Sequence, residues 1–68
     1  METAYGDFLR DVVITIHMNM RELKERRNFA DPEELAHIEA KQIAYEEVIS
    51  ILRASADEFG IQKDEFGL

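Results

Sequence analysis

The chain contains no cysteine and no long apolar run, and both absences limit what it can be. Without cysteine, disulfides and thiolate metal sites are excluded, which fits a reducing compartment such as the cytoplasm. No apolar stretch approaches the about 20 residues that span a bilayer, and the start METAYGDFLRD lacks the basic and apolar segments of a signal peptide. We therefore expect a soluble, cytoplasmic protein that has no membrane partner.

Basic residues are also scarce. Eight lysines and arginines stand against 15 acids and give a net charge of −7, and the excess of acids lies entirely in residues 31–68. Such a chain attracts nucleic acid and anionic membranes poorly, so we expect neither as a partner. One basic cluster lies at the end of the first expected helix, where it complements the helix dipole, and it is the only basis for an RNA contact. It comprises Arg21, Lys24, Arg26 and Arg27.

The clearest local signal is the stretch ADPEEL in the middle of the chain. Asp31 has the side chain of a helix N-cap, Pro32 suits the first helical position, and Glu34 has the spacing of a capping-box partner. Apolar residues then recur every three or four positions, without a glycine or proline before Gly60. This pattern predicts a helix over residues 32–59 that is ended by Gly60 in the left-handed conformation.

The first half of the chain admits two interpretations. The segment VVITIHMNM, residues 12–20, alternates in polarity and is β-branched at its start, as in a strand. The apolar residues from Tyr5 to Leu23 also fall on one arc of a helix, and no glycine or proline interrupts residues 7–27. We favour a helix over residues 5–28, because the chain offers no second strand. A strand paired across a dimer would instead indicate a ribbon-helix-helix DNA-binding protein.

Two helices of similar length joined by the short stretch NFAD predict an antiparallel hairpin. We expect an all-α fold with one domain over residues 1–60, in which two copies of the hairpin assemble as a homodimeric four-helix bundle. A short C-terminal tail over residues 61–68 repeats the letters DEFG that end the second helix, and it carries Phe66 and Leu68. Because it has no helical lead-in, we expect the tail to fray or to pack on a neighbour, and its role stays open.

The second helix carries more apolar residues than one neighbouring helix can cover, and two more lie on the back of the first helix. Each such side chain gains about 1.5–3 kcal/mol on burial, so the surplus supplies association energy for a dimer. The expected dimer interface comprises Ile14, Met18, Tyr45, Val48, Ile49, Ile51, Leu52 and Phe59. Gln42 would lie in the bundle core or at its rim, with Lys41 beside it.

Few residues indicate chemistry. Glu34 and His37 have the Glu-x-x-His spacing of di-metal bundles, but Glu34 is expected in the capping box and His37 at the surface near the loop. Glu22 and Glu25 match half of the acidic signature of all-α nucleoside-triphosphate pyrophosphohydrolases, and the sequence lacks the second half. We therefore predict no catalytic residue, no metal site and no cofactor, and we expect that the protein is not an enzyme.

The expected architecture resembles that of the Rop family of plasmid RNA-binding proteins. The shared features are a short acidic hairpin that dimerises, a loop with Ala30-Asp31, and a helix that ends at Phe59-Gly60. The resemblance lies in topology, since the spacing from the loop to Phe-Gly differs and the RNA-contacting residues of that family have no counterparts one by one. We expect a non-enzymatic protein–protein interaction or structural module that acts on an unknown protein partner as a small regulator or accessory subunit. The alternative is a nucleic-acid-related regulator, either by Rop-like RNA binding through the basic cluster or as an acidic DNA mimic.

Overall fold

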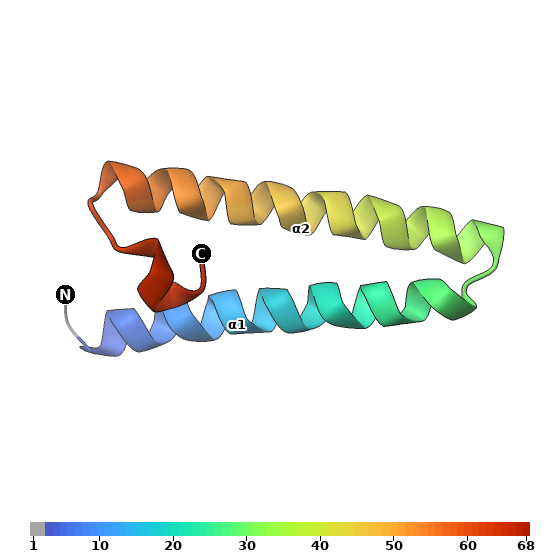
Figure 1. Cartoon of the computed structure of the whole chain (residues 1–68), viewed down its shortest axis with the longest axis horizontal. Helices are drawn as coiled ribbons and strands as arrows, with labels where there is room; N and C mark the ends of the chain where they lie inside the picture. Colours follow the sequence, from blue (N-terminus) through green and yellow to red (C-terminus); the bar gives the residue numbers. More distant parts are fainter. Residues whose placement is uncertain (1–2) are drawn as a thin grey trace.

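The structure, a computed structural model that describes residues 3–68, is an antiparallel helical hairpin (Figure 1). Helix α1 spans Thr3–Arg26 and helix α2 spans Pro32–Glu58. A short 3-10 turn, η1, over Arg27–Phe29 begins the connection between them, and a second one, η2, over Lys63–Phe66 follows α2. The predicted all-α hairpin is confirmed, and the described residues contain no strand.

Helix α1 runs without a break through residues 12–20, so the strand interpretation of this segment is excluded. Val13 and Ile16 are buried there, and this burial outweighs the weak helix propensity of β-branched residues. The α-helical geometry ends at Arg26, two residues earlier than expected, because the chain tightens into η1 before the loop. Met1 and Glu2, which we placed in the same domain, lie outside the described residues.

Helix α2 begins at the predicted cap. The Asp31 Oδ1 atom accepts a hydrogen bond from the backbone N–H of Glu34 at 2.8 Å, and Pro32 is the first helical residue. Only this half of the expected capping box forms in residues 3–68. The Glu34 carboxylate accepts instead from the Arg26 guanidinium at 3.0 Å, because the hairpin brings the end of α1 within its reach. Glu34 therefore links the two helices across the loop.

Helix α2 ends as predicted, at a glycine in the left-handed conformation. Gly60 has a φ of 68°, and its N–H donates to the carbonyl of Asp57 at 3.3 Å. The N–H of Ile61 donates to the carbonyl of Ala56 at 2.8 Å, and together these two bonds make a Schellman motif. Because the motif turns the chain back toward α1, the tail runs along the hairpin rather than away from it (Figure 1).

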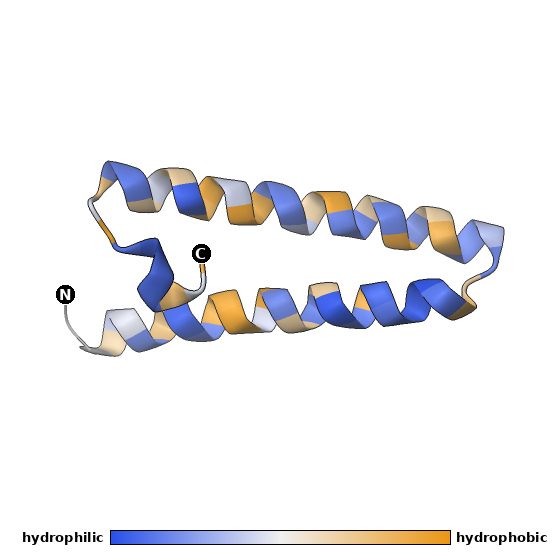
Figure 2. Cartoon of the chain, in the orientation of Figure 1, coloured by the Kyte–Doolittle hydropathy of each residue, from blue (hydrophilic) through white to orange (hydrophobic). Residues whose placement is uncertain are grey.

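The core of the hairpin is a narrow seam between α1 and α2. Hydrophobic residues recur along both helices and are separated by hydrophilic ones, as Figure 2 shows. Since each helix has a single long neighbour, only the residues that face the seam become buried. The buried apolar residues are Val13, Ile16, Leu23, Ile38, Ile49, Ala56 and Phe66. Large apolar residues that stay exposed are Tyr5, Phe8, Ile14, Met18, Phe29, Ile43, Val48, Ile51 and Phe59.

The hairpin is elongated, with extents of 45 × 19 × 15 Å. Its radius of gyration is 14.3 Å, whereas a compact domain of this length has about 11 Å. Its accessible surface is 5388 Å², whereas a compact monomer of its mass exposes about 4,400 Å². The chain therefore exposes about 1,000 Å² more than a compact monomer of the same mass would.

Replacing Asp31 tests the start of α2. Asp31→Ala removes the acceptor of the Glu34 N–H, and we expect the free energy of unfolding to fall by about 1 kcal/mol. Asp31→Asn keeps an acceptor at the same place and is the matched control, with a loss well below that of the alanine variant. Urea denaturation followed by circular dichroism measures both, and equal losses in the two variants would contradict the cap.

Candidate interaction surfaces

The tail folds back and packs on the hairpin. The η2 turn contacts both α1 and α2, and the Phe66 side chain is only 4% exposed. The guanidinium carbon of Arg10 lies 5.1 Å from the centre of the Phe66 ring, within the range of a cation–π interaction. Gly6 lies beside the ring and is itself buried. Phe66 therefore anchors the tail near the N-terminal end of α1.

Polar groups of both helices hold the main chain of the tail. Arg10 Nε donates to the carbonyl oxygen of Glu65 at 3.2 Å, and Arg53 Nε donates to the backbone oxygen of Leu68 at 2.8 Å. His17 Nε2 lies 3.0 Å from the carbonyl oxygen of Gly67, which only accepts, so the ring nitrogen is the donor. These three bonds recognise backbone atoms and are independent of the side chains at the positions they read.

The repeated DEFG adopts one local conformation twice. Gly67 has a φ of 75°, its N–H points to the Asp64 carbonyl at 3.5 Å, and the Leu68 N–H donates to the Lys63 carbonyl at 2.9 Å. These are the same two positions that are bonded at the end of α2. The aromatic residues differ, because Phe59 is 77% exposed whereas Phe66 is buried. The repeat is therefore the same chain-reversing turn in two environments.

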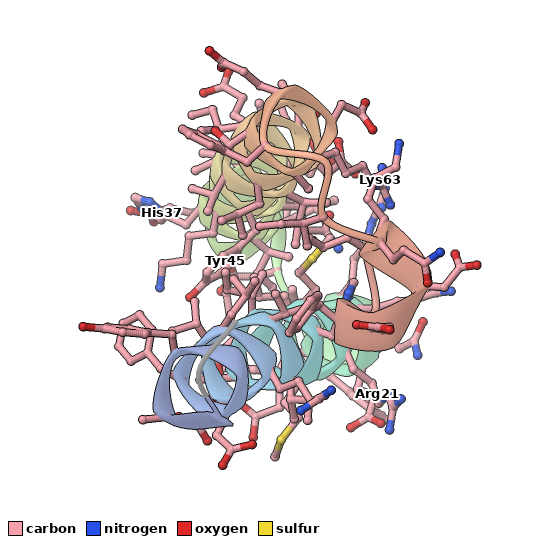
Figure 3. All side chains as sticks on the ribbon, turned by 90° about the vertical axis from the view of Figure 1, so that its left-hand side faces the viewer. Arg21, His37, Tyr45 and Lys63 are labelled. Carbon is pink, nitrogen blue, oxygen red and sulfur yellow. The ribbon has the colours of Figure 1, made fainter. Side chains whose placement is uncertain are left out.

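The tail divides the surface of the hairpin into two sides. In the end-on view of Figure 3, the tail and Lys63 lie on one side of the helices, and His37 projects on the other. On the tail side, a hollow of about 370 Å³ is lined by His17, Met20, Glu46, Ile49, Ser50 and Arg53. On the other side, a hollow of about 340 Å³ is lined by Lys41, Ala44, Tyr45 and Val48.

Several of the exposed apolar residues gather on the side away from the tail. Val48 lines the hollow there, and Phe59 follows it by eleven residues, about three helical turns. On α1, Phe8 has the same spacing from Asn19, which lines a neighbouring hollow with Tyr45. We call this surface the open face, and it comprises Tyr5, Phe8, Val48, Ile51 and Phe59.

The residues expected at a dimer interface do not share one surface. Val48, Ile51 and Phe59 lie on the open face, and Tyr45 and Leu52 are half-buried between it and the seam. Ile49 is only 4% exposed, so within one chain it already belongs to the hairpin core. Ile14 and Met18 lie on the side of α1 that is turned away from α2. They are 55% and 58% exposed.

Two polar residues expected near the core take different places. Gln42 is half-buried at the rim of a hollow on the tail side, whereas Lys41 is exposed on the side of the open face. Sequence reasoning missed the polar contact that links the helices near Lys41. Asn19 Nδ2 donates to the hydroxyl of Tyr45 at 3.1 Å in a partly buried position.

The basic cluster is split by ion pairs. Arg26 pairs with Glu34 at 3.0 Å, and Arg27 Nη2 lies 3.4 Å from the carboxylate of Glu39. Arg21 and Lys24 line a hollow of about 330 Å³ on the tail side, together with Met20, Gln42 and Glu46. Two of the four cations therefore stabilise the loop end of the hairpin, and the other two border the groove along the tail side.

The residues weighed as metal ligands are dispersed. Glu34 is occupied by Arg26 and by its place at the helix start, and His37 is exposed on the side away from the tail. Within residues 3–68, no three histidine or carboxylate side chains come together as a group that could hold a metal ion. The helices of the same segment include none that is long and apolar enough to cross a membrane.

Comparison of the chain with known protein families, with curated proteins and with solved structures found no match. What the chain does is therefore inferred from its own geometry.

Removing the hydroxyl of Tyr45 tests the polar contact between the helices. Tyr45→Phe leaves the partly buried Asn19 amide without its acceptor, and we expect a loss of about 1 kcal/mol in the free energy of unfolding. Tyr5→Phe removes the same atom from a side chain that is 66% exposed, and we expect a change within about 0.5 kcal/mol. Thermal and urea denaturation measure both, and equal effects would show that the hydrogen bond contributes nothing.

Proposed function

We propose that the chain is a non-enzymatic interaction module that works as a homodimeric four-helix bundle, in which two hairpins pack through their open faces. The observation that carries this proposal is the excess of exposed surface. The chain exposes about 1,000 Å² more than a compact monomer of its mass, and a standard protein–protein interface buries about 800 Å² on each partner. One interface of ordinary size therefore removes most of the excess.

A second copy suits the open face because the face includes residues of both helices. A hairpin that packs on it adds two long neighbours, so each helix then has a neighbour on two sides, as in other four-helix bundles. The face also contains a hollow over the small side chain of Ala44, beside Val48. A large side chain of the partner copy, such as Phe8 or Phe59, fills such a hollow in the manner of a knob in a hole.

The dimer also supplies what a chain of this size lacks on its own. Among the described residues only Val13 is fully buried, and the buried apolar residues form a single row between the helices. Small domains without disulfides or metals usually need a partner subunit to reach a stable core. Packing Val48, Ile51 and Phe59 between two hairpins would widen the row into a core.

We propose further that the dimer acts as a regulator or accessory subunit of another protein. The polar groups of the loop end support a binding role over a catalytic one, because they are engaged in structural contacts. Arg26 holds Glu34, Arg27 holds Glu39, and Asp31 caps α2. Surfaces that remain available are elongated apolar and charged faces, which suit a protein partner.

A charge on the open face tests the dimer. Val48→Glu would bury a carboxylate between the two hairpins, and we expect a dimer at micromolar concentration to become a monomer whose helical circular dichroism is lost at a lower temperature. Sedimentation velocity measures the oligomeric state.

Ile43→Glu is the matched control on the same helix. Ile43 is 58% exposed, and it lies about 140° around α2 from Val48, outside the open face. We expect this variant to remain a dimer. A wild-type chain that sediments as a monomer, or equal effects of the two substitutions, would contradict the proposal.

A further inference from the structure

The surface on which the tail packs has the features of a peptide-binding groove. It takes one aromatic ring, which is Phe66, and it binds main-chain carbonyls through Arg10, His17 and Arg53. It also selects a glycine after the aromatic residue. At Gly67 the φ is 75°, in the left-handed region that L side chains rarely adopt. The groove therefore takes a phenylalanine followed by glycine, and Lys63 of the tail adds an ion pair with Asp57 at 2.8 Å.

The tail fills only part of this groove. His17 and Arg53, which bind its last two carbonyls, also line the hollow of about 370 Å³ that continues toward the loop. That hollow shares Met20 and Glu46 with the next one, so the two are continuous. The groove thus extends well beyond Leu68 along the seam between α1 and α2.

The unfilled part of the groove is apolar at its base and mainly cationic at its rim. Met20 contributes to both hollows, and Ile49 lines the nearer one. The charged groups around the hollows are the cations Arg21, Lys24 and Arg53 and one carboxylate, Glu46. In a chain with a net charge of −7, this is a local concentration of positive charge, which favours an acidic ligand.

We propose that this groove binds a segment of another protein that carries Phe-Gly and an aliphatic residue followed by acidic residues. Residues 63–68 occupy the groove when that segment is absent. This inference rests on the proposed role as an interaction module and names the chemistry of its partner. It concerns the side opposite the open face, so groove binding and dimerisation are separable by experiment.

A partner segment must compete with the tethered tail for the groove. Because only residues 59–62 connect the tail to α2, the effective concentration of the tail at the groove is of the order of millimolar. A segment that copies the tail alone competes poorly against it. A segment that continues past the aliphatic residue gains contacts with Met20 and with the cations Arg21 and Lys24, and these contacts allow it to displace the tail.

Fluorescence polarisation with labelled peptides tests the groove in the full chain. The probe is the peptide KDEFGLSEE, which continues the tail sequence with acidic residues, and KDEAGLSEE and KDEFGLSQQ are its controls. We expect the probe to bind the wild-type chain, the alanine control not to bind, and the neutral control to bind about threefold or more weakly. Equal binding of all three peptides would overturn the proposal.

Releasing the tail from the groove should increase the affinity for the probe. Phe66→Ala removes the anchor of the tail, and we expect the affinity for the probe to rise about tenfold. Phe29→Ala removes the same side chain at the loop, where Phe29 is 89% exposed and outside both the groove and the open face, and we expect no change in probe affinity. Where circular dichroism finds Phe66→Ala unfolded, Gly67→Ala replaces it, because this variant loosens the tail by backbone strain without leaving a cavity. We expect about fivefold tighter binding by Gly67→Ala.

The outcomes separate this inference from the dimer. A monomeric Val48→Glu chain that still binds the probe supports the proposed groove on the tail side and shows that probe binding does not require the dimer. A dimeric wild type that binds no probe, with no gain from Phe66→Ala or Gly67→Ala, overturns the groove proposal alone.

Discussion

The hairpin depends on one constraint: each long helix has only one long neighbour. Side chains that face the seam are buried, and the others are buried only where the tail or a partner covers them. Val13 and Ile49 lie inside the seam, whereas Val48 is 41% exposed although it directly precedes Ile49 on α2. The tail covers one flank of the seam and leaves the other flank open. One side of the molecule is therefore covered by the tail, and the other leaves apolar side chains exposed. The proposals for dimer and groove follow from that difference.

The two DEFG segments separate local from tertiary chemistry. Both form the same pair of backbone hydrogen bonds, and both place the glycine at positive φ, because that turn needs only a glycine and the preceding backbone. The turn does not determine whether the aromatic residue before each glycine is buried. Phe59 points away from the seam and is exposed, while Phe66 falls beside Gly6 and Arg10 and is buried. The local sequence thus determines the turn, and the position along the hairpin determines the burial.

The same distinction explains how much of the fold was predictable from sequence. Asp31, Pro32 and Gly60 act within a few residues of themselves, so the start and the end of α2 were predictable from their chemistry. Glu34 was expected to complete a capping box, but its carboxylate pairs with Arg26, and that partner comes close only when the hairpin closes. The pattern of residues 12–20 fitted a strand as well as a helix, so the helix was favoured because the chain offers no second strand. Burial against α2 is the physical reason for the helix.

The candidate surfaces were less predictable than the fold. Periodicity indicated a surplus of apolar residues, but it treats all flanks of a helix alike. Ile49 therefore appeared among the interface residues although α1 already covers it, and Ile14 and Met18 appeared with Val48 although they lie on a different side. For the tail, the choice between fraying and packing on a neighbour stayed open, because a polar segment gives no periodic signal. Its available signal was the repeat itself, since a second Phe-Gly with an aliphatic residue after it indicates a second chain reversal.

The positions of the two surfaces give the proposed dimer a further property. A two-fold axis through the open faces places the grooves of the two copies on the outer sides of the bundle. Neither groove is covered by the partner hairpin, because the tail lies on the side opposite the open face, where His37 projects (Figure 3). A partner protein with two suitable segments then engages both grooves, and the second contact forms at a high effective concentration. A segment that binds too weakly to displace one tail by itself gains enough avidity in this way. Dimerisation would therefore favour partners with two such segments over partners with one.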